Sequence, residues 1–219
     1  MNDSRELILG RIRERLGRSE ANASAAGAAI DAALRACASG PRPPGGADSK
    51  SLLDAFRVRS EALASTVDEV AGLTDMPRAV AAYLAEHKLA PRAVCVPDLA
   101  GLDWAGAGIG VEARAAVDAD LVGITGCFRA IAETGTLMLC SGPATPATIS
   151  LLPETHIAVV PASTILASME EGWAAARAAF GQLPRAVNFI SGPSRTGDIE
   201  QTIVRPAHGP KNMHVLIIR

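Results

Sequence analysis

The sequence predicts an α/β fold, with a largely parallel or mixed β-sheet flanked by helices and a helical extension at the N-terminus. Apolar residues make up 48% of the chain but aromatic residues only 3%, so Ala, Val, Leu and Ile must fill a core between closely spaced elements. Helical patterns dominate before Pro91, and short apolar runs broken by Gly and Pro follow it. Strands that alternate with a helix over short connections are typical of crossover units and a parallel sheet.

The N-terminal region divides into a helix and a linker. Residues 1–17 are predicted to form an amphipathic helix that docks on the domain or on a partner. Its apolar face consists of Leu7, Ile8, Ile12 and Leu16. Residues 18–49 are rich in Ala, Gly, Ser and Pro, which predicts a linker whose Ala-rich middle can be helical. Residues 50–219 are then expected to form a single α/β domain, since this length suits one core.

Two helices are predicted at the start of this domain. The first spans Ser51 to Ala71, where apolar residues recur at helical spacing and Val67 and Val70 belong to the buried face. The second spans Met76 to His87, with Pro77 in its first turn, where a missing amide proton costs nothing.

The rest of the chain is predicted to alternate between short strands and one further helix. That helix spans Ile165 to Phe180, with apolar residues at intervals of three and four. RAIAETG and TLMLCSG can form two short strands or one interrupted strand. The other strands are expected in AVCVP, DWAGAGIGVEA, ADLVGIT, HIAVVPAS, AVNFISGPS and MHVLIIR.

Charge and cysteine usage exclude several classes of function. The net charge of −2 and the scattered arginines disfavour nucleic-acid binding. Charged residues interrupt the apolar start, and no window approaches the ~18 continuous apolar residues of a membrane span, so we expect a soluble protein of the cytoplasm. The cysteines are Cys37, Cys95, Cys127 and Cys140. They form no C-x-x-C pair, which predicts reduced thiols and no zinc, iron–sulfur or other metal site in this chain.

Two loops between Gly123 and Pro143 are candidates for a ligand site, because ligands of open α/β sheets bind where the strands end. In the first loop, Gly126 follows Thr125 and precedes Cys127, and small residues suit a close ligand. Cys127 is either a nucleophile or, as we favour, a packed thiol. The second loop contains Glu133. This carboxylate is either a catalytic group (a base, a nucleophile or a ligand clamp) or a structural group that accepts backbone N–H bonds.

The residues beside Glu133 and two later loops complete the candidate site. Thr134 and Gly135 are expected to bind substrate together with Gly126. Ser194, Arg195 and Thr196 can present amide protons and a guanidinium to an anion, although Ser194 or Thr196 can also simply cap a helix. If the turn that holds His208 and Lys211 faces the other loops, we expect His208 to be a catalytic group and Lys211 to bind the anion. We therefore predict that Glu133, Arg195 and His208 converge on one cleft.

Four motifs in order resemble the lactate utilization protein C family, whose domain is called the LUD domain. They are AIAETGTLML, SLLPETHIAVVP, SGPSRTGDIE and HGPKNMHVLII, and the similarity covers Ser51 to Arg219. The resemblance implies a fold similar to that of sugar-phosphate isomerases, coenzyme A transferases and formyltetrahydrofolate cyclo-ligase. It also implies a cytoplasmic role in oxidising L-lactate to pyruvate, together with two partner proteins, at least one of which carries iron–sulfur clusters.

Two functions follow from this resemblance. In the first, the chain is a non-redox, accessory component of the lactate system that binds a small carboxylate or anion, holds no cofactor of its own and can form an oligomer. In the second, it is a stand-alone acyl- or CoA-transferring enzyme, because the E-x-G pattern at Glu133 and Gly135 is similar to the glutamate motif of coenzyme A transferases. Whether the chain is itself an enzyme is left open by the sequence.

Overall fold

The computed structural model describes residues 2–36, 40, 49–194 and 209–219. The chain divides into two compact units, Met1–Pro44 and Gly45–Arg219. The first unit contains α1 (Asn2–Arg15) and α2 (Glu20–Ala36), so the Ala-rich part of the predicted linker is helical. In the described parts of the chain, no helix combines the length and the hydropathy needed to cross a bilayer.

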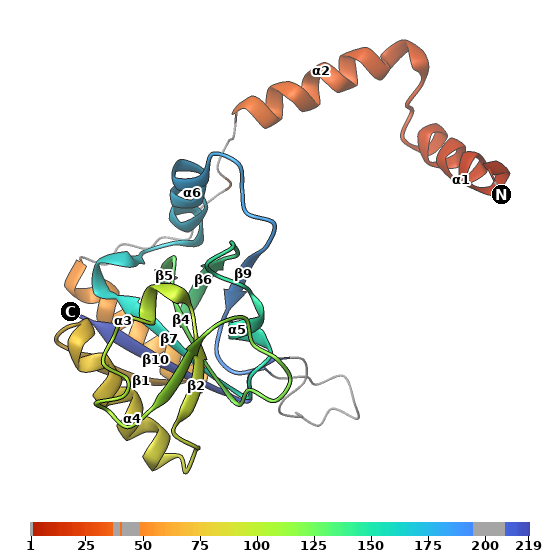
Figure 1. Ribbon diagram of the computed structural model, residues 1–219. Helices are drawn as coiled ribbons and strands as arrows, with labels where there is room; N and C mark the ends of the chain where they lie inside the picture. Colours follow the sequence, from red (N-terminus) through yellow and green to blue (C-terminus); the bar gives the residue numbers. More distant parts are fainter. Residues whose placement is uncertain (1, 37–39, 41–48, 195–208) are drawn as a thin grey trace. The chain divides into compact units, whose positions relative to one another are not determined.

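The second unit is built on a six-stranded sheet in which every described pairing is parallel (Figure 1). The sheet has the order β1-β10-β7-β4-β2-β3. The strands are β1 (Thr66–Val70), β2 (Arg92–Cys95), β3 (Gly110–Ala113), β4 (Val122–Gly126), β7 (Thr155–Pro161) and β10 (Asn212–Ile218). The predicted α/β class with a largely parallel sheet is therefore confirmed.

A smaller four-stranded sheet, which the sequence pattern did not predict, has the order β8-β5-β6-β9. Its strands are β5 (Arg129–Ile131), β6 (Thr136–Cys140), β8 (Ile165–Leu166) and β9 (Val187–Ile190). RAIAETG and TLMLCSG thus form two strands, which pair as an antiparallel hairpin. Only Cys127 and Phe128 connect β4 of the large sheet to β5 of the small one.

Helices cover both faces of the large sheet. They are α3 (Ser49–Ala62), α4 (Met76–Glu86) and α5 (Thr148–Leu151), whereas α6 (Met169–Phe180) packs against β5 and β8 of the small sheet. Short 3₁₀ turns lie at Leu73–Asp75, Pro97–Leu99 and Ala162–Thr164. Alternate residues of a strand point to opposite faces, and those of β7 and β10 divide accordingly between two buried clusters. One cluster includes the buried side chains of α4, and the other includes Phe56 of α3 and the small sheet.

The predicted helix from Ser51 to Ala71 is too long. It ends at Ala62, and Val67 and Val70 belong to β1 instead. The helix is closed by a bond from Ser65 N–H to Ser60 O (3.0 Å) and one from Ala64 N–H to Glu61 O (2.8 Å), with Ala64 at a φ of 67°. This is a Schellman motif, in which glycine normally occupies the left-handed position. Because alanine stands there, the sequence carries no glycine to mark the helix end.

The predicted helix from Ile165 to Phe180 begins four residues later than expected. Ile165 and Leu166 form β8, and Ser168 caps α6 by accepting a hydrogen bond from Glu171 N–H. The Glu171 carboxylate reaches back to Ala167 N–H at 3.0 Å. Such a reciprocal Ser-x-x-Glu cap fixes the helix start more strongly than the apolar spacing does.

Gly123 of β4 is required by the packing of α5. A Cβ atom at Gly123 would lie 2.0 Å from the carbonyl oxygen of Ile149, far inside van der Waals contact. The absence of a side chain lets the α5 backbone rest directly on β4, near the start of the strand.

Candidate functional site

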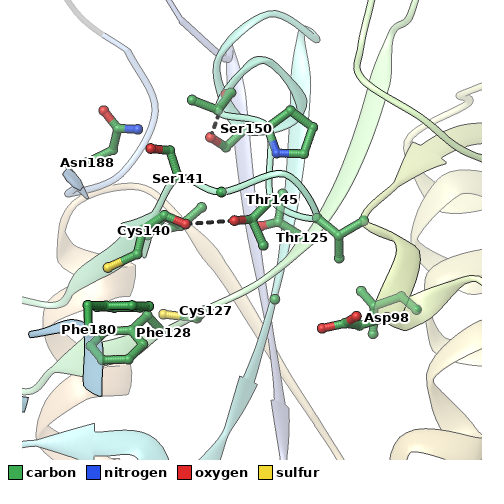
Figure 2. A pocket seen from close by; sticks show the side chains of 17 residues that line it. Asp98, Thr125, Cys127, Phe128, Cys140, Ser141, Thr145, Ser150, Phe180 and Asn188 are labelled. Atoms are coloured by element: carbon green, nitrogen blue, oxygen red, sulfur yellow. Dashed lines mark hydrogen bonds between the residues drawn. The ribbon is translucent and has the colours of Figure 1, made fainter. Parts of the chain in front are cut away.

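A pocket of about 320 Å³ lies at the carboxyl edge of the large sheet, where β2 and β4 end beside the small sheet (Figure 2). We call it the carboxyl-edge pocket. Its described lining comprises Val96, Asp98 and Leu99 after β2, Thr125 to Phe128 at the end of β4 and just beyond it, Leu139 to Gly142 at the end of β6, Thr145 to Ala147 and Ser150 around α5, and Phe180 and Asn188. This is the edge at which parallel sheets bind ligands.

The hydroxyl of Thr125 is held by a hydrogen bond to a buried histidine. The Thr125 side chain lines the pocket, and its Oγ1 lies 2.7 Å from Nε2 of His156. His156 sits in the middle of the sheet on β7 with no exposed surface, and burial lowers its pKa to about 3. A neutral ring both donates and accepts, so the tautomer of His156 decides whether Thr125 offers the pocket a hydroxyl proton or a lone pair.

Backbone bonds hold the other hydroxyl groups of the pocket. Thr145 donates to the carbonyl of Cys140 at 2.8 Å, and Ser150 donates to the carbonyl of Ala147 at 3.0 Å. Ser141 Oγ accepts from Ala186 N–H at 2.9 Å and so keeps its own proton available. Figure 2 shows these hydroxyls with the Asn188 amide around one side of the pocket. The arrangement presents neutral hydrogen-bonding groups in fixed positions.

The remaining wall is largely apolar. Phe128 and Phe180 pack with ring centroids 5.1 Å apart. Cys127 donates its thiol proton to the carbonyl of Arg129 at 2.8 Å, and burial raises its pKa to about 12. Because a thiol with this pKa remains protonated at neutral pH, the geometry supports the packed-thiol interpretation of Cys127 over a nucleophile. Burial also raises the pKa of Cys140.

The pocket carries little charge. Among its described lining residues, Asp98 is the only Asp, Glu, Lys, Arg or His. A ligand that enters it is therefore held by shape and by neutral donors and acceptors of these residues. Of the residues predicted to bind substrate, Gly126 lies in this lining, as the last residue of β4 and not in a loop as expected. Its role in binding stays a prediction.

Glu133 lies in the turn of the β5–β6 hairpin, is exposed, and is not among the residues that line the pocket. Its Oε1 accepts a hydrogen bond from Met169 N–H at 2.9 Å, and its own N–H donates to Ala167 O at 3.2 Å. The carboxylate thus meets the first turn of α6, where a negative charge is favourable. This contact matches the second interpretation of Glu133, a structural carboxylate that accepts backbone N–H bonds.

Gly135 has a packing role next to the exposed Thr134. Its φ is +63°, and a Cβ atom would lie 2.6 Å from Ser60 N. The Gly135 carbonyl also accepts a bond from Ser60 Oγ at 3.3 Å. The hairpin approaches α3 so closely at this position that only glycine fits. The glycine of the E-x-G pattern is therefore explained by packing, without a ligand.

The third candidate loop is described only at its two ends. Ser194 N–H donates to Pro210 O at 2.8 Å, so the ends of the loop meet, and Thr136 Oγ1 lies 2.7 Å from Ser191 Oγ beside the hairpin. Lys211 is exposed. Arg195, Thr196 and His208 lie outside the described residues. The predicted convergence of Glu133, Arg195 and His208 therefore stays a prediction.

Several lining residues had no local sequence signal. Asp98, Phe180 and Asn188 come from three separate elements, and only the packing of the two sheets brings them together. Ser141 could have been found, because Ser-Gly-Pro follows a strand both at 141–143 and at 191–193. The first of these two motifs lines the pocket through Ser141 and Gly142.

A family model described as LUD domain matches residues 54–218. Among solved structures, the crystal structure of a DUF162 family protein from Deinococcus radiodurans is similar, with a TM-score of 0.60 and 26% identity over 80% of this chain and 100% of that one. The matched region thus contains both sheets and the carboxyl-edge pocket.

Curated relatives match a shorter part of the chain. "Lactate utilization protein C" of Shouchella clausii is 39% identical over 99 residues, which are 44% of this chain and 43% of that protein. The protein of the same name from Halalkalibacterium halodurans is 42% identical over 92 residues, 41% of this chain and 40% of that one. "Uncharacterized protein NMB1437" of Neisseria meningitidis serogroup B is 38% identical over 96 residues, 44% and 41% of the two chains. The matches span less than half the length of these relatives.

Proposed function

The chain belongs to the LUD domain family, and from this premise we propose that it acts in lactate utilization. The observation that carries the proposal is the name "Lactate utilization protein C" of relatives that are 39% and 42% identical to it over about a hundred residues. In this role the chain is a non-redox component of a cytoplasmic system that oxidises L-lactate to pyruvate. Partner proteins with iron–sulfur clusters carry the electrons.

The carboxyl-edge pocket supports a small-molecule role within that system. L-Lactate has a carboxylate and a hydroxyl, both of which need hydrogen-bond partners when they leave water. Thr125, Ser141 and Asn188 line the pocket with neutral groups of this kind. Gly126 beside them allows close approach of a ligand to the backbone. We therefore place the binding of a small carboxylate at this pocket, with Thr125 as its central residue.

Binding can be measured by NMR titration of the full-length ¹⁵N-labelled chain with L-lactate and with pyruvate. Signals of Gly126, Cys127 and Ser141 should shift saturably. Thr125→Val removes one hydroxyl and should weaken binding about threefold to tenfold, the effect of one lost neutral hydrogen bond. Asp118→Asn is the matched control, because Asp118 is exposed in the loop before β4 and does not line the pocket. If Thr125→Val binds with the same affinity and gives the same shifts, the carboxylate does not bind at this pocket.

The role in the cell is tested by deletion of the gene. Growth on L-lactate should be lost and restored by the intact chain, and an iron–sulfur protein should co-purify with it. Normal growth on lactate, in a strain without a second lactate system, would refute the proposal.

The acyl-transfer alternative depends on Glu133 as a nucleophile. The contact of its Oε1 with Met169 N–H engages the carboxylate in capping α6, which favours the lactate role instead. Incubation with acetyl-CoA followed by mass spectrometry tests this alternative directly. A glutamyl-CoA thioester on Glu133, formed with release of acetate and absent from Glu133→Gln, would establish CoA transfer.

A further inference from the structure

A second pocket, also of about 320 Å³, lies near the amino ends of β1 and β10. We call it the amino-edge pocket. All described pairings of the large sheet are parallel, so the amino ends of its strands lie together and the carboxyl ends lie together. The two pockets therefore lie at opposite ends of the strands. It is formed where the ends of α3 and α4 approach the edge strand β1, which pairs with β10 at Thr66 and His214.

The described lining of the amino-edge pocket is strongly acidic. It contains the carboxylates of Glu61, Asp68 and Glu86, and neither Lys nor Arg is among the described residues that line it. Asp68 retains 66% of its side-chain exposure, so it is hydrated and accessible from solvent. A concave surface with this balance of charge attracts cations.

His214 adds an observation that points to a bound ligand. The residue is 1% exposed, and Nδ1 lies 2.8 Å from Thr66 Oγ1. Its Nε2 has no hydrogen-bond partner among the described residues. Asp68 Oδ2 lies 3.9 Å from Nε2, beyond hydrogen-bond distance. A buried polar nitrogen without a partner is costly, and this one belongs to a side chain that lines the pocket.

The hydrogen bonds of Thr66 determine what Nε2 can bind. Thr66 Oγ1 donates to the carbonyl of Met213 at 3.4 Å. A hydroxyl has one proton, so when that proton is on the Met213 carbonyl, the same oxygen accepts from Nδ1–H of His214. The ring is neutral at pH 7, because burial lowers its pKa to about 4. Nε2 then carries a lone pair, and it stands beside a second acceptor on Asp68.

The ring of His214 is held in place by an aromatic column. It stacks on Tyr83 of α4 with centroids 4.1 Å apart and an interplanar angle of 23°, and the ring centroids of Tyr83 and His87, the residue after α4, are 4.2 Å apart. These stacks hold the plane of the His214 ring. The acceptors at Nε2 and Asp68 Oδ2 lie 3.9 Å apart.

We propose that the amino-edge pocket binds an organic cation with N–H donors, a primary ammonium or a guanidinium, through Nε2 of His214 and the carboxylate of Asp68. One such group can donate to both acceptors while Glu61 and Glu86 contribute favourable charge. A divalent metal fits less well, because no group of three His, Cys, Asp or Glu side chains among the described residues is arranged to hold one. The site is separate from the carboxyl-edge pocket, so its failure would leave the proposed lactate role untouched.

The test is a titration of the full-length protein with methylguanidinium and with butylammonium, followed by the side-chain ¹⁵N signals of its histidines. The Nε2 signal of His214 should begin in the unprotonated range and shift saturably. Tetramethylammonium has the same charge but no N–H group, and it should leave Nε2 unshifted. Equal shifts with tetramethylammonium, or an Nε2 that is already protonated in the free protein, would overturn the proposal.

Two variants extend this test. Asp68→Asn keeps the shape of an exposed side chain and should weaken binding about threefold to fivefold, as expected for one accessible charge pair. Asp118→Asn is again the control and should leave binding unchanged. His214→Phe keeps the aromatic column and should abolish saturable binding; if this variant does not fold, Asp68→Asn alone decides. Unchanged affinity in Asp68→Asn would refute the site.

Discussion

Lowering the pH from 7 to 5 should destabilise the folded chain through His156. In the folded protein, burial lowers the pKa of this histidine to about 3, whereas a histidine in an unfolded chain has a pKa of about 6.5. Between these two pKa values, the unfolded state therefore binds a proton at this histidine that the folded state does not bind. Stability is complete above about pH 7 and falls as the pH drops through 6.5 toward 3.

The magnitude follows from the two pKa values. At pH 5 nearly every unfolded chain is protonated at this position, and almost no folded chain is. Linkage then gives a loss of about 2 kcal/mol between pH 7 and pH 5 from His156. His214, whose pKa burial lowers to about 4 against the opposing effect of Asp68, should add a similar loss of about 2 kcal/mol.

Urea unfolding of the full chain at pH 7, 6 and 5 measures this loss, provided that the slope m is the same at each pH. His156→Gln should lower stability at pH 7 but remove about half of the pH-dependent loss. In the folded wild-type protein, the ring ¹⁵N signals of His156 should stay in the neutral range down to pH 5. A stability that is equal at pH 7 and pH 5, or protonation of the folded His156 near pH 6, would refute the reasoning.

Three further predictions concern single residues. Gly123→Ala should cost about 1–3 kcal/mol or more by overpacking, because its Cβ would lie 2.0 Å from Ile149 O; an unchanged urea midpoint would contradict the close contact. Glu133→Gln should lower stability by about 0.3–1 kcal/mol through loss of a charge at the start of α6, with lactate affinity unchanged; loss of lactate binding would return Glu133 to the site. Cys127 should resist iodoacetamide at pH 8 in the folded chain, since its pKa is raised to about 12, and rapid labelling mapped by mass spectrometry would contradict this.

The element order was largely predictable, because local patterns report local burial. The continuous apolar run of β7 matches a strand that is buried from Thr155 to Val160, as expected for a strand covered on both faces. A helix from Met76 to His87 was predicted with Pro77 in its first turn, and α4 spans Met76–Glu86 with Val80, Tyr83 and Leu84 buried. The errors fell at boundaries, where Ala64 in a left-handed conformation and the Ser168 cap outweighed the periodicity.

The assignment of β9 shows where local patterns fail. AVNFISGPS has the same strand-then-glycine pattern as the strands of the large sheet, yet β9 pairs antiparallel with β6 in the small one. Periodicity records that a segment is extended and how much of it is covered. It contains no information about which strand lies beside it.

The sequence by itself determined the α/β class and the order of most strands and helices. The tertiary structure alone decided that Glu133 caps α6 and that Thr125 is supported by His156 from the neighbouring strand. It also decided that Asn188 and Phe180 reach the carboxyl-edge pocket, and that His214 meets Asp68 at the opposite edge. The physical reason is that burial and backbone propensity act between residues close in the chain, whereas a site is assembled from strand pairing and helix packing between distant segments.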